Sequence, residues 1–490
     1  MKTSKHIAID LGAGSGRVIL GHFQKEKLDV EIVHRFPNIV QKSAGHERWY
    51  TKALFHEIET GLKIIAQSDV NPISIGVDTW GVDYGLFNND GILIEEPICY
   101  RDSRTNDIMA HVFERLPKEQ IYQKTGIQFL PINTLFQLVS HTQSDEWPAK
   151  AARLLMMPDL FHYDLCGKMT GEYSDASTTG LLNVFTKKWD PELFAALELP
   201  LNIMPEPYDS GAHIGVLKLK LQEETGLPEL KVIAPATHDT ASAVVGTPLK
   251  KNWAYISSGT WSLVGIEVSA PIINDACLQA NFTNEGGAFG SIRFLKNVMG
   301  LWILESCRKE WQAQGQRHNY SALLQQINAT KPFQAFVNPD DLRFLNPANM
   351  VQEIKQYLEE TAQPTISGEA AVSRLILESL ALRYASVIES IQDITGEEIR
   401  GVHIIGGGSQ NDFLNQATAN ATGLAVIAGP VEATAIGNLL VQAISCGRFQ
   451  DVREARAFIQ KTTPVKHFLP QNIQRWREAF RRYKQLEEFV

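Results

Sequence analysis

Val232 to Gly246 reads VIAPATHDTASAVVG, an apolar run that breaks at a polar corner and continues in small residues. The pattern predicts a buried strand, a turn at residues 237–240, and a helix that continues to Val245. Asp239 then lies in the first turn of that helix, where unpaired N–H groups and the helix dipole favour an ionised carboxylate. Such a group is suited to accept a proton from a hydroxyl, although helix capping is the simpler interpretation of an isolated motif.

Two strand–turn–strand patterns lie about half the chain apart. Ile7 to Phe23 reads IAIDLGAGSGRVILGHF, and Ala254 to Val268 reads AYISSGTWSLVGIEV. Each predicts a β-hairpin whose tip of glycine and hydroxyl residues can bind phosphate through its N–H groups. Neither tip is a Walker A loop, and neither is a GxGxxG motif that opens a helix. The recurrence indicates an internal repeat.

The length of 490 residues exceeds what one hydrophobic core usually contains. The repeat and the linker-like stretch Pro248 to Asn252 predict two α/β domains, residues 1–246 and 247–490. A charged terminal helix from Trp476 to Phe489 is expected on the surface, with the option of packing back on the first domain.

The composition excludes several classes of protein. A net charge of −9 argues against a nucleic-acid partner, and 44% hydrophobic with 21% charged residues is typical of a folded soluble protein. The five cysteines have no metal-binding spacing, and neither a signal peptide nor a membrane span is evident. We therefore expect a cytoplasmic protein with reduced thiols and no membrane partner.

Other stretches have two readings each. The charged patch of Arg101, Asp102 and Arg104 is either a solvated salt-bridge cluster or the rim of a substrate cleft. Gly401 to Ala421 predicts a strand, a triple glycine and a helix capped by Ser409. Such glycines can lie against a flat nucleobase, or they can form only a tight turn.

Two further helices are predicted in the second half of the chain. One runs from about Asn297 to Lys309, and a long, largely buried one runs from Ala370 to Ile394.

Together these features fit one arrangement: a nucleotide between two domains, Mg²⁺ linked to Asp10, and Asp239 facing an acceptor hydroxyl. This resembles a duplicated ribonuclease H-like, actin-related α/β fold with a nucleotide and sugar cleft between the domains. The transition state of phosphoryl transfer is loose, so positioning and charge neutralisation dominate and a weak carboxylate base is sufficient.

From about Ile7 to about Phe468 the chain resembles the FGGY family of carbohydrate kinases, most closely the members that act on L-rhamnulose. The motifs that carry the resemblance are DLGAGSGRV, IGVDTWGVD, YRDSRT, GIQFLPINTLFQL, MPDLFHYDLCGK, THDTASAV, SSGTWSL, TNEGG, LKNVMGLW, GGGSQN and AGPVEATAIGN.

The resemblance implies ATP-dependent phosphorylation of the 1-hydroxyl of L-rhamnulose in L-rhamnose catabolism, with Asp239 as proton acceptor. The implied ketose contacts are Gly81, His238, Asp239, Thr240 and Asn297. The implied nucleotide contacts are Ala13, Gly14, Ser15, Gly16, Arg17, Thr260, Glu305, Gly407 and Asn411. Related kinases have Gln where Glu305 stands, so we expect a local rearrangement or a solvent-facing role for this carboxylate.

Three alternatives stay open. One is a kinase for another ketose, such as L-fuculose or D-xylulose. Another is an actin-like or Hsp70-like nucleotide switch, against which the Asp239 corner argues. The third is a catalytically silent sugar sensor, against which Asp10, Asp239 and Thr260 argue. We expect a monomer or a small homo-oligomer.

Overall fold

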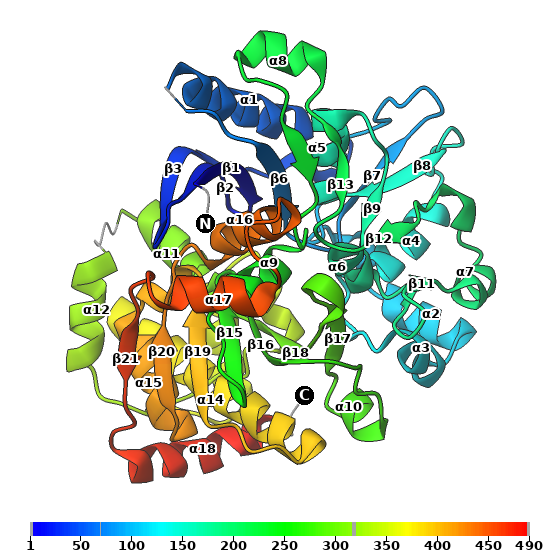
Figure 1. The fold of residues 1–490 in the computed structure, drawn as a ribbon. Helices are drawn as coiled ribbons and strands as arrows, with labels where there is room; N and C mark the ends of the chain where they lie inside the picture. The colour runs from blue at the N-terminus through cyan, green and yellow to red at the C-terminus, as the bar shows by residue number, and fades with distance from the viewer. Residues whose placement is uncertain (1–2, 69, 316–319, 488–490) are drawn as a thin grey trace. The chain divides into compact units, whose positions relative to one another are not determined.

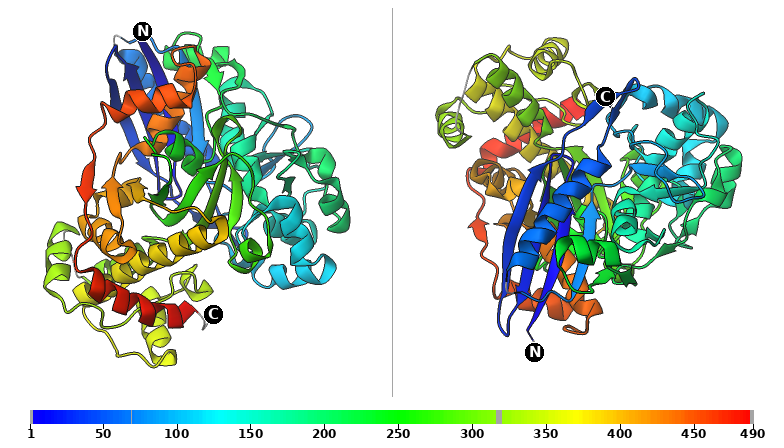
Figure 2. Two further views of the ribbon diagram at one scale, coloured as in Figure 1. Left: turned by 60° about the horizontal axis from the view of Figure 1, so that its bottom comes forward. Right: turned by 90° about the horizontal axis from the view of Figure 1, so that it is seen from above.

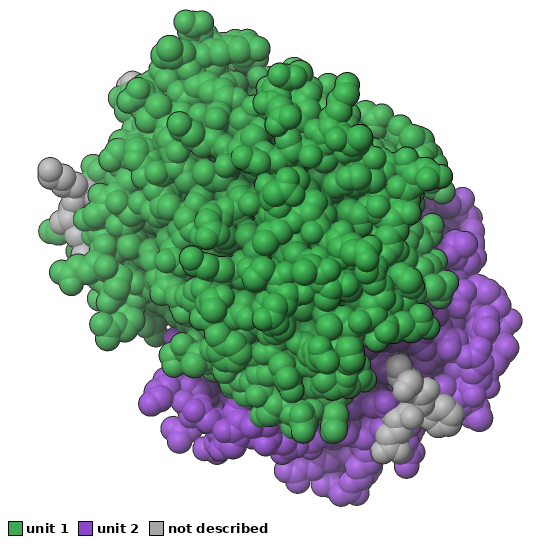
Figure 3. Space-filling view, turned by 90° about the vertical axis from the view of Figure 1, so that its right-hand side faces the viewer, with its two compact units in different colours: residues 1–248, 267–295, 432–463 green, residues 249–266, 296–431, 464–490 purple. Residues whose placement is uncertain are grey.

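The computed structural model describes residues 3–68, 70–315 and 320–487 (Figure 1). The chain forms two compact units, coloured separately in Figure 3. Unit 1 comprises residues 1–248, 267–295 and 432–463, and unit 2 comprises residues 249–266, 296–431 and 464–490. The first crossing, after Pro248, falls in the predicted linker. The division differs from a single break after Gly246, because two later segments return to unit 1 and the terminal helix α18 (Ile473–Glu487) belongs to unit 2.

Unit 1 is built on a six-stranded sheet. Its strands, in spatial order, are β13 (His213–Val216), β14 (Lys231–Ile233), β6 (Ser74–Thr79), β1 (Ser4–Leu11), β2 (Ser15–Phe23) and β3 (Leu28–Pro37). Strands β1, β2 and β3 form an antiparallel meander, and β6 and β14 continue parallel to β1. The predicted first hairpin is confirmed.

Helices α1 (Thr51–Gln67) and α16 (Ala433–Ser445) cover opposite faces of β2 (Figure 2). A Cβ on Gly61 of α1 would lie 2.6 Å from the Val18 Cβ, and a Cβ on Gly21 would lie 2.5 Å from Leu439 of α16. Side chains at positions 18 and 21 point to opposite faces of a strand, because the side-chain period is two. The segment 432–463 thus belongs to unit 1 because α16 packs on this sheet.

The sheet of unit 2 repeats the same strand order. In spatial order this sheet contains β17 (Thr283–Gly286, a segment of unit 1), β18 (Ile292–Met299), β16 (Trp261–Val268), β15 (Trp253–Ser258), β19 (Gly401–Ile405), β20 (Ala425–Ala428) and β21 (Lys466–Phe468). The six strands from β18 to β21 correspond to the six strands of the first sheet. Strands β15 and β16 form the second predicted hairpin, and β19 and β20 run parallel to β15. The internal repeat is therefore a duplicated α/β fold. Strands β16 and β18 continue across the division between units, at residues 266/267 and 295/296.

The remaining strands of unit 1 are β4 (Gln41–Ser43), β5 (His46–Arg48), β7 (Tyr84–Phe87), β8 (Arg153–Met156), β9 (Gly171–Glu172), β10 (Leu182–Asn183), β11 (Lys188–Trp189), β12 (Pro207–Tyr208) and β17 (Thr283–Gly286). Its remaining helices are α2 (Ile108–Arg115), α3 (Lys118–Thr125), α4 (Thr134–Thr142), α5 (Met157–Cys166), α6 (Tyr173–Ala176), α7 (Pro191–Ala196), α8 (Leu219–Thr225), α9 (Asp239–Val245), α10 (Asp275–Gln279) and α17 (Val452–Gln460). Unit 2 adds α11 (Trp302–Ala313), α12 (Tyr320–Ala329), α13 (Met350–Glu360), α14 (Glu369–Thr395) and α15 (Asp412–Thr422).

Two local predictions are wrong. Asn297 lies on strand β18, and helix α11 starts only at Trp302, because Gly300 makes a turn after the strand. The cap of α15 is Asn411, whose side chain accepts from the Leu414 N–H at 3.0 Å, whereas Ser409 bonds back to the Gly406 carbonyl. The long helix α14 is confirmed. Over the described ranges, no helix has the length and apolar character that a bilayer span requires.

Candidate active site

Two acidic strand ends and the start of helix α9 meet at one edge of the sheet of unit 1. Asp10 on β1 is the register partner of Asp78 on β6, and the two strands are parallel. His238, which precedes α9, forms a parallel bridge with Thr79. Because the carboxyl ends of parallel strands lie at the same edge, the loops after β1, β6 and β14 together form a site.

Asp239 is the first residue of α9, as predicted. The Thr240 hydroxyl donates to its Oδ1 at 3.2 Å. Burial, and secondarily the charge of Asp10, raise the pKa of Asp239 to about 7 against the effect of the Thr240 hydrogen bonds. A carboxylate with a pKa near neutrality is suited to general base catalysis.

Asp10 and Asp78 are both buried, at 2% and 0% exposure. Arg17 lies across the hairpin from Asp10, with Nη2 2.8 Å from Asp10 Oδ2, and it also pairs with Glu432. Asn438 of α16 donates to Asp78 Oδ2 at 2.6 Å, and no described group donates to the buried Asp78 Oδ1. Burial and the charge of Asp10 raise the pKa of Asp78 well above its ordinary value.

Gly81 lies in the turn after β6, where a side chain would be tightly packed. A Cβ there would lie 3.0 Å from Asp175 Oδ1, 3.2 Å from Thr178 Oγ1 and 3.4 Å from His238 Cδ2. Gly81 and His238, both predicted to contact the ketose, are therefore close neighbours. His238 also contacts the fully buried Arg293, whose Nη2 lies 3.0 Å from its Nδ1.

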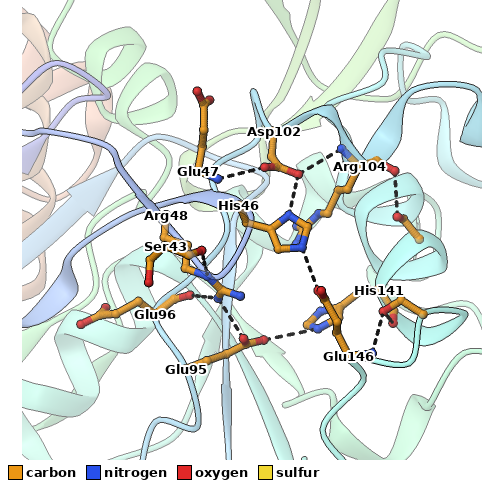
Figure 4. Close-up of polar contacts among 12 residues, drawn as sticks. Ser43, His46, Glu47, Arg48, Glu95, Glu96, Asp102, Arg104, His141 and Glu146 are labelled. Carbon is orange, nitrogen blue, oxygen red and sulfur yellow. Dashed lines mark hydrogen bonds and ion pairs between the residues drawn. The ribbon is translucent and has the colours of Figure 1, made fainter.

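At the patch of Arg101 to Arg104 the structure argues against a solvated cluster, and the other alternative, the rim of a substrate cleft, stays a prediction. Asp102 is only 7% exposed and accepts from the His46 ring, the Glu47 N–H and the Arg104 N–H (Figure 4). It is therefore not a solvated cluster. The guanidinium of Arg104 donates to Gln137 Oε1 at 2.6 Å.

From Gln137 the hydrogen bonds continue inward. Its Nε2 donates to Asp83 Oδ1 at 3.0 Å, and Asp83 Oδ2 accepts from the indole N–H groups of Trp49 and Trp80. Trp80 directly precedes Gly81. The patch therefore helps to hold the turn that carries a predicted ketose contact.

The predicted first phosphate loop is the tip of the β1–β2 hairpin. The Gly12 N–H donates to the Ser15 carbonyl at 2.9 Å, and Asn38 Nδ2 donates to the Gly12 carbonyl at 3.0 Å. Gly14 is exposed, and a Cβ on it would meet no described atom within 4 Å. The backbone of the tip is thus fixed by hydrogen bonds, while the space beside Gly14 is open. A loop that binds an anion through its N–H groups requires both properties.

The second loop, at residues 258–260, is the corresponding tip in unit 2. The N–H groups of Gly300 and Leu301 donate to the carbonyls of Thr260 and Gly259, at 3.1 and 2.9 Å, which ties the start of α11 to the tip. A Cβ on Gly408 would lie 2.0 Å from Ser258 Oγ. Unit 2 thus brings the Thr260 tip together with the predicted nucleotide loop of Gly407 and Asn411.

Substitution of the two adjacent glycines of this loop, Gly407 and Gly408, is expected to have different effects. A Cβ on Gly407 meets no described atom within 4 Å, whereas one on Gly408 clashes with Ser258. We expect Gly407→Ala to raise KM for ATP about tenfold, or about 1.4 kcal/mol, without lowering Tm, because the methyl fills ligand space. We expect Gly408→Ala to lower stability by about 1–3 kcal/mol, the usual effect of overpacking.

Kinetics and thermal unfolding of both variants check this pair. If Gly407→Ala left KM for ATP unchanged, Gly407 would not face the nucleotide. Ser258→Gly combined with Gly408→Ala should recover part of the lost stability, because it removes the clashing hydroxyl.

Glu305 lies in the first turn of α11 and pairs with Arg308, whose Nη1 is 2.6 Å from Glu305 Oε1. Its side chain is 48% exposed. The structure favours the solvent-facing role, in which a carboxylate near a helix N-terminus is also favourable. Its nucleotide contact stays a prediction.

The structure brings together the unit 1 residues Asp10, Gly81, His238 and Asp239. Asn297, also predicted to contact the ketose, belongs to unit 2 and stays a prediction. Sequence reasoning missed four residues of the site in unit 1: Asp78, Glu285, Arg293 and Asn438. The parallel patterns IAIDLG and IGVDTWG were a signal for Asp78, since each ends a strand in Asp.

Two family models together match most of the chain. The N-terminal domain of the FGGY family of carbohydrate kinases matches residues 6–246, and the C-terminal domain matches residues 254–446. Curated relatives include rhamnulokinases of Bacteroides thetaiotaomicron, 44% identical over 97% of this chain and 98% of the relative, and of Bacillus subtilis, 43% identical over 96% of each.

Solved structures with a similar fold include gluconate kinase from Lactobacillus acidophilus, with a TM-score of 0.81 at 15% identity over 99% of this chain and 98% of that one. Xylulose kinase from the same organism has a TM-score of 0.80 at 16% identity over 99% and 98%. Plasmodium falciparum glycerol kinase has a TM-score of 0.74 at 14% identity over 99% and 98%. At these identities the likeness establishes the two-domain fold alone.

Proposed function

The chain belongs to the FGGY family of carbohydrate kinases, and from this premise we propose that it phosphorylates the 1-hydroxyl of L-rhamnulose with ATP. The product is L-rhamnulose 1-phosphate, an intermediate of L-rhamnose catabolism. The assignment of L-rhamnulose as substrate rests on the 44% identity, over nearly the full length, to a rhamnulokinase. Because the reaction consumes ATP, we propose that it takes place in the cytoplasm, with the enzyme a monomer or small homo-oligomer.

The alternatives lose ground for different reasons. An actin-like switch is set aside because both halves of the chain match models of carbohydrate kinases. The preserved Asp10, Asp239 and Thr260 argue against a silent sensor. A kinase for L-fuculose or D-xylulose is an outcome that the substrate assay separates.

In the proposed mechanism Asp239 accepts the proton of the ketose 1-hydroxyl as its oxygen attacks the γ-phosphorus of ATP. The position of this carboxylate at the start of α9 supports that role. Gly81, His238 and Thr240 line the ketose, with Asn297 as a further contact. The hairpin tips at Ala13 to Arg17 and at Thr260 hold phosphates through backbone and hydroxyl donors.

The acidic edge fits a magnesium ion. Asp10 and Asp78 supply hard oxygen ligands, and Asp78 Oδ1 is buried with no described hydrogen-bond donor. The described residues contain no group of three or more His, Cys, Asp or Glu in a metal-holding arrangement. Mg²⁺ usually takes one or two carboxylates and completes its shell with water and substrate phosphates, so two ligands are sufficient. When bound, the ion neutralises charge on the phosphates.

The first assay is ATP turnover with Mg²⁺ across L-rhamnulose, L-fuculose, L-ribulose, D-xylulose and glycerol. A strong preference for L-rhamnulose with a 1-phosphate product is expected. Preference for another ketose would overturn the substrate but keep the Asp239 chemistry. ATP hydrolysis that no sugar changes would overturn the proposed function.

The pH dependence of kcat/KM for the ketose gives a further expectation. The base acts when ionised, and burial raises the pKa of Asp239 to about 7. Activity is therefore expected to fall about tenfold per pH unit below pH 7 and to level off above it. An acidic limb centred near pH 4 would show that the carboxylate titrates as if exposed.

A further inference from the structure

A fully buried arginine, Arg293, contacts the Nδ1 side of the His238 ring. Arg293 on β18 is 0% exposed, and its Nε donates to the Gly286 carbonyl at 2.9 Å. Its Nη2 lies 3.0 Å from His238 Nδ1 and 3.1 Å from Glu285 Oε2. These contacts fix the guanidinium in one orientation, and Glu285 balances its charge.

The contact decides which ring nitrogen carries the proton. A guanidinium has only donors, so at 3.0 Å His238 Nδ1 must be the acceptor and must be unprotonated. The competing arrangement has Nδ1–H donating to Glu285 Oε2, which is 3.6 Å away and beyond hydrogen-bond range. The proton of a neutral His238 is therefore on Nε2.

We infer that Arg293 is a positioning residue that keeps His238 neutral and protonated on Nε2, so that the ring donates to a sugar hydroxyl and leaves Asp239 basic. His238 Nε2 is 3.5 Å from Asp239 Oδ1, too far for a good hydrogen bond, which leaves Nε2–H for the substrate. A cationic ring at that distance would lower the pKa of Asp239 by about 1–3 units and weaken the base. The role in substrate binding rests on the proposed function, whereas the protonation state does not.

The other charged groups around His238 agree with this assignment. Arg293 and Glu285 face it from β18 and β17, Asp239 from α9, and Asp175 from α6 across the Gly81 turn. Burial, and then the charge of Arg293, lower the pKa of His238 well below its ordinary value. The carboxylates around the ring would favour a cation, and Arg293 is the one described cation in contact with it.

Nitrogen NMR of the full-length protein labelled with ¹⁵N-histidine tests the protonation state directly. The His238 signals are assigned by their loss in His238→Gln. The expected result is a neutral, Nε2-protonated ring from pH 6 to 8. An imidazolium, or a ring protonated on Nδ1, overturns the inference with no variant of Arg293 needed.

Arg293→Met tests the cause. The pKa of His238 is then expected to rise, although burial still opposes the charged ring, because Glu285 lies 3.6 Å from Nδ1 and loses its cationic partner. A ring that becomes cationic 3.5 Å from Asp239 should move the acidic limb of kcat/KM to lower pH, since its effect outweighs the minor one of the lost Arg293 charge. Arg293→Lys keeps a cationic donor and should restore most of the wild-type limb. If Arg293→Met lowered kcat but changed neither the pH of the acidic limb nor the protonation of His238, the role of Arg293 would be merely structural.

Arg456→Met is the matched control in the same unit. Arg456 also joins a carboxylate, Glu267 at 2.7 Å, to a backbone carbonyl, Val244 at 2.8 Å, near the far end of α9. Arg456→Met should leave the acidic limb of kcat/KM and the His238 spectrum unchanged. If the wild type phosphorylated no ketose, the proposed function would fail, while the spectrum would still decide the protonation state.

Discussion

Asp239→Asn is expected to bind the ketose with nearly unchanged affinity and to lower kcat by about 10²- to 10⁴-fold, the contribution of a well-placed general base. Asparagine has the same shape but cannot take the proton of the 1-hydroxyl. Steady-state ADP release gives kcat, and calorimetric titration with the ketose gives affinity. Turnover within tenfold of the wild type would remove Asp239 from the role of base.

A measurement of thermal stability distinguishes this loss of kcat from a loss caused by unfolding. Because the pKa of Asp239 is raised from 3.8 to about 7, the folded state holds this proton more tightly than the unfolded chain does. This carboxylate therefore lowers the free energy of unfolding as pH rises from about 4 to about 7, and the full loss persists above that range. Asp239→Asn should consequently have the same or a higher Tm at pH 8.

Asp190→Asn is the matched control. Asp190 is likewise an aspartate at a helix start of unit 1, but it is buried, and its Oδ1 accepts from the N–H groups of Glu192 and Leu193. Its Oδ2 accepts from Lys124 and Asn183, and an amide nitrogen at that place could accept from neither. The change should lower Tm and leave kcat close to wild type. Asp190→Asn is thus expected to lower Tm with little change in kcat, whereas Asp239→Asn is expected to keep or raise Tm at pH 8 and to lose most of kcat.

The parts that sequence predicted well are those with local causes. Apolar runs on both sides of a glycine-rich tip specify both hairpins, and small residues after a polar corner specify α9 with Asp239 in its first turn. Duplication of this pattern was enough to predict the repeated α/β fold. The same logic failed at Asn297, where an apolar stretch was assigned to a helix although Gly300 ends a strand there.

The missed parts depend on contacts between distant residues. Asn438 donates to Asp78 across 360 positions, and Arg293 meets His238 across 55. Neither residue carries a local signature, because a buried polar side chain is recognisable only by its partner. The return of residues 432–463 to unit 1 has the same origin, since Asn438 and Gln442 of α16 donate to carbonyls of β6 and β1, which lie far away along the chain.

Gly437→Ala is expected to have the largest effect on stability. A Cβ at this position would lie 1.7 Å from the Ser242 carbonyl oxygen, and one on Gly246 would lie 2.0 Å from the Ala433 carbonyl oxygen. These backbones of α9 and α16 touch, so no side chain can move to make room. The helices must separate, at a cost of about 1–3 kcal/mol or more for overpacking, which lowers Tm by several degrees.

The same separation displaces the start of α9, and a shift of about 1 Å in a catalytic group can cost about 10²-fold in rate. Without the clash the sign would reverse, since alanine is better than glycine in a helix by about 1 kcal/mol. A rise in Tm for Gly437→Ala would thus refute the close crossing. Thr434→Ala, in the first turn of α16, is the control and should change Tm and kcat little. Loss of both properties in Gly437→Ala alone would mean that α16, supplied by a distant part of the chain, seats the helix that carries Asp239.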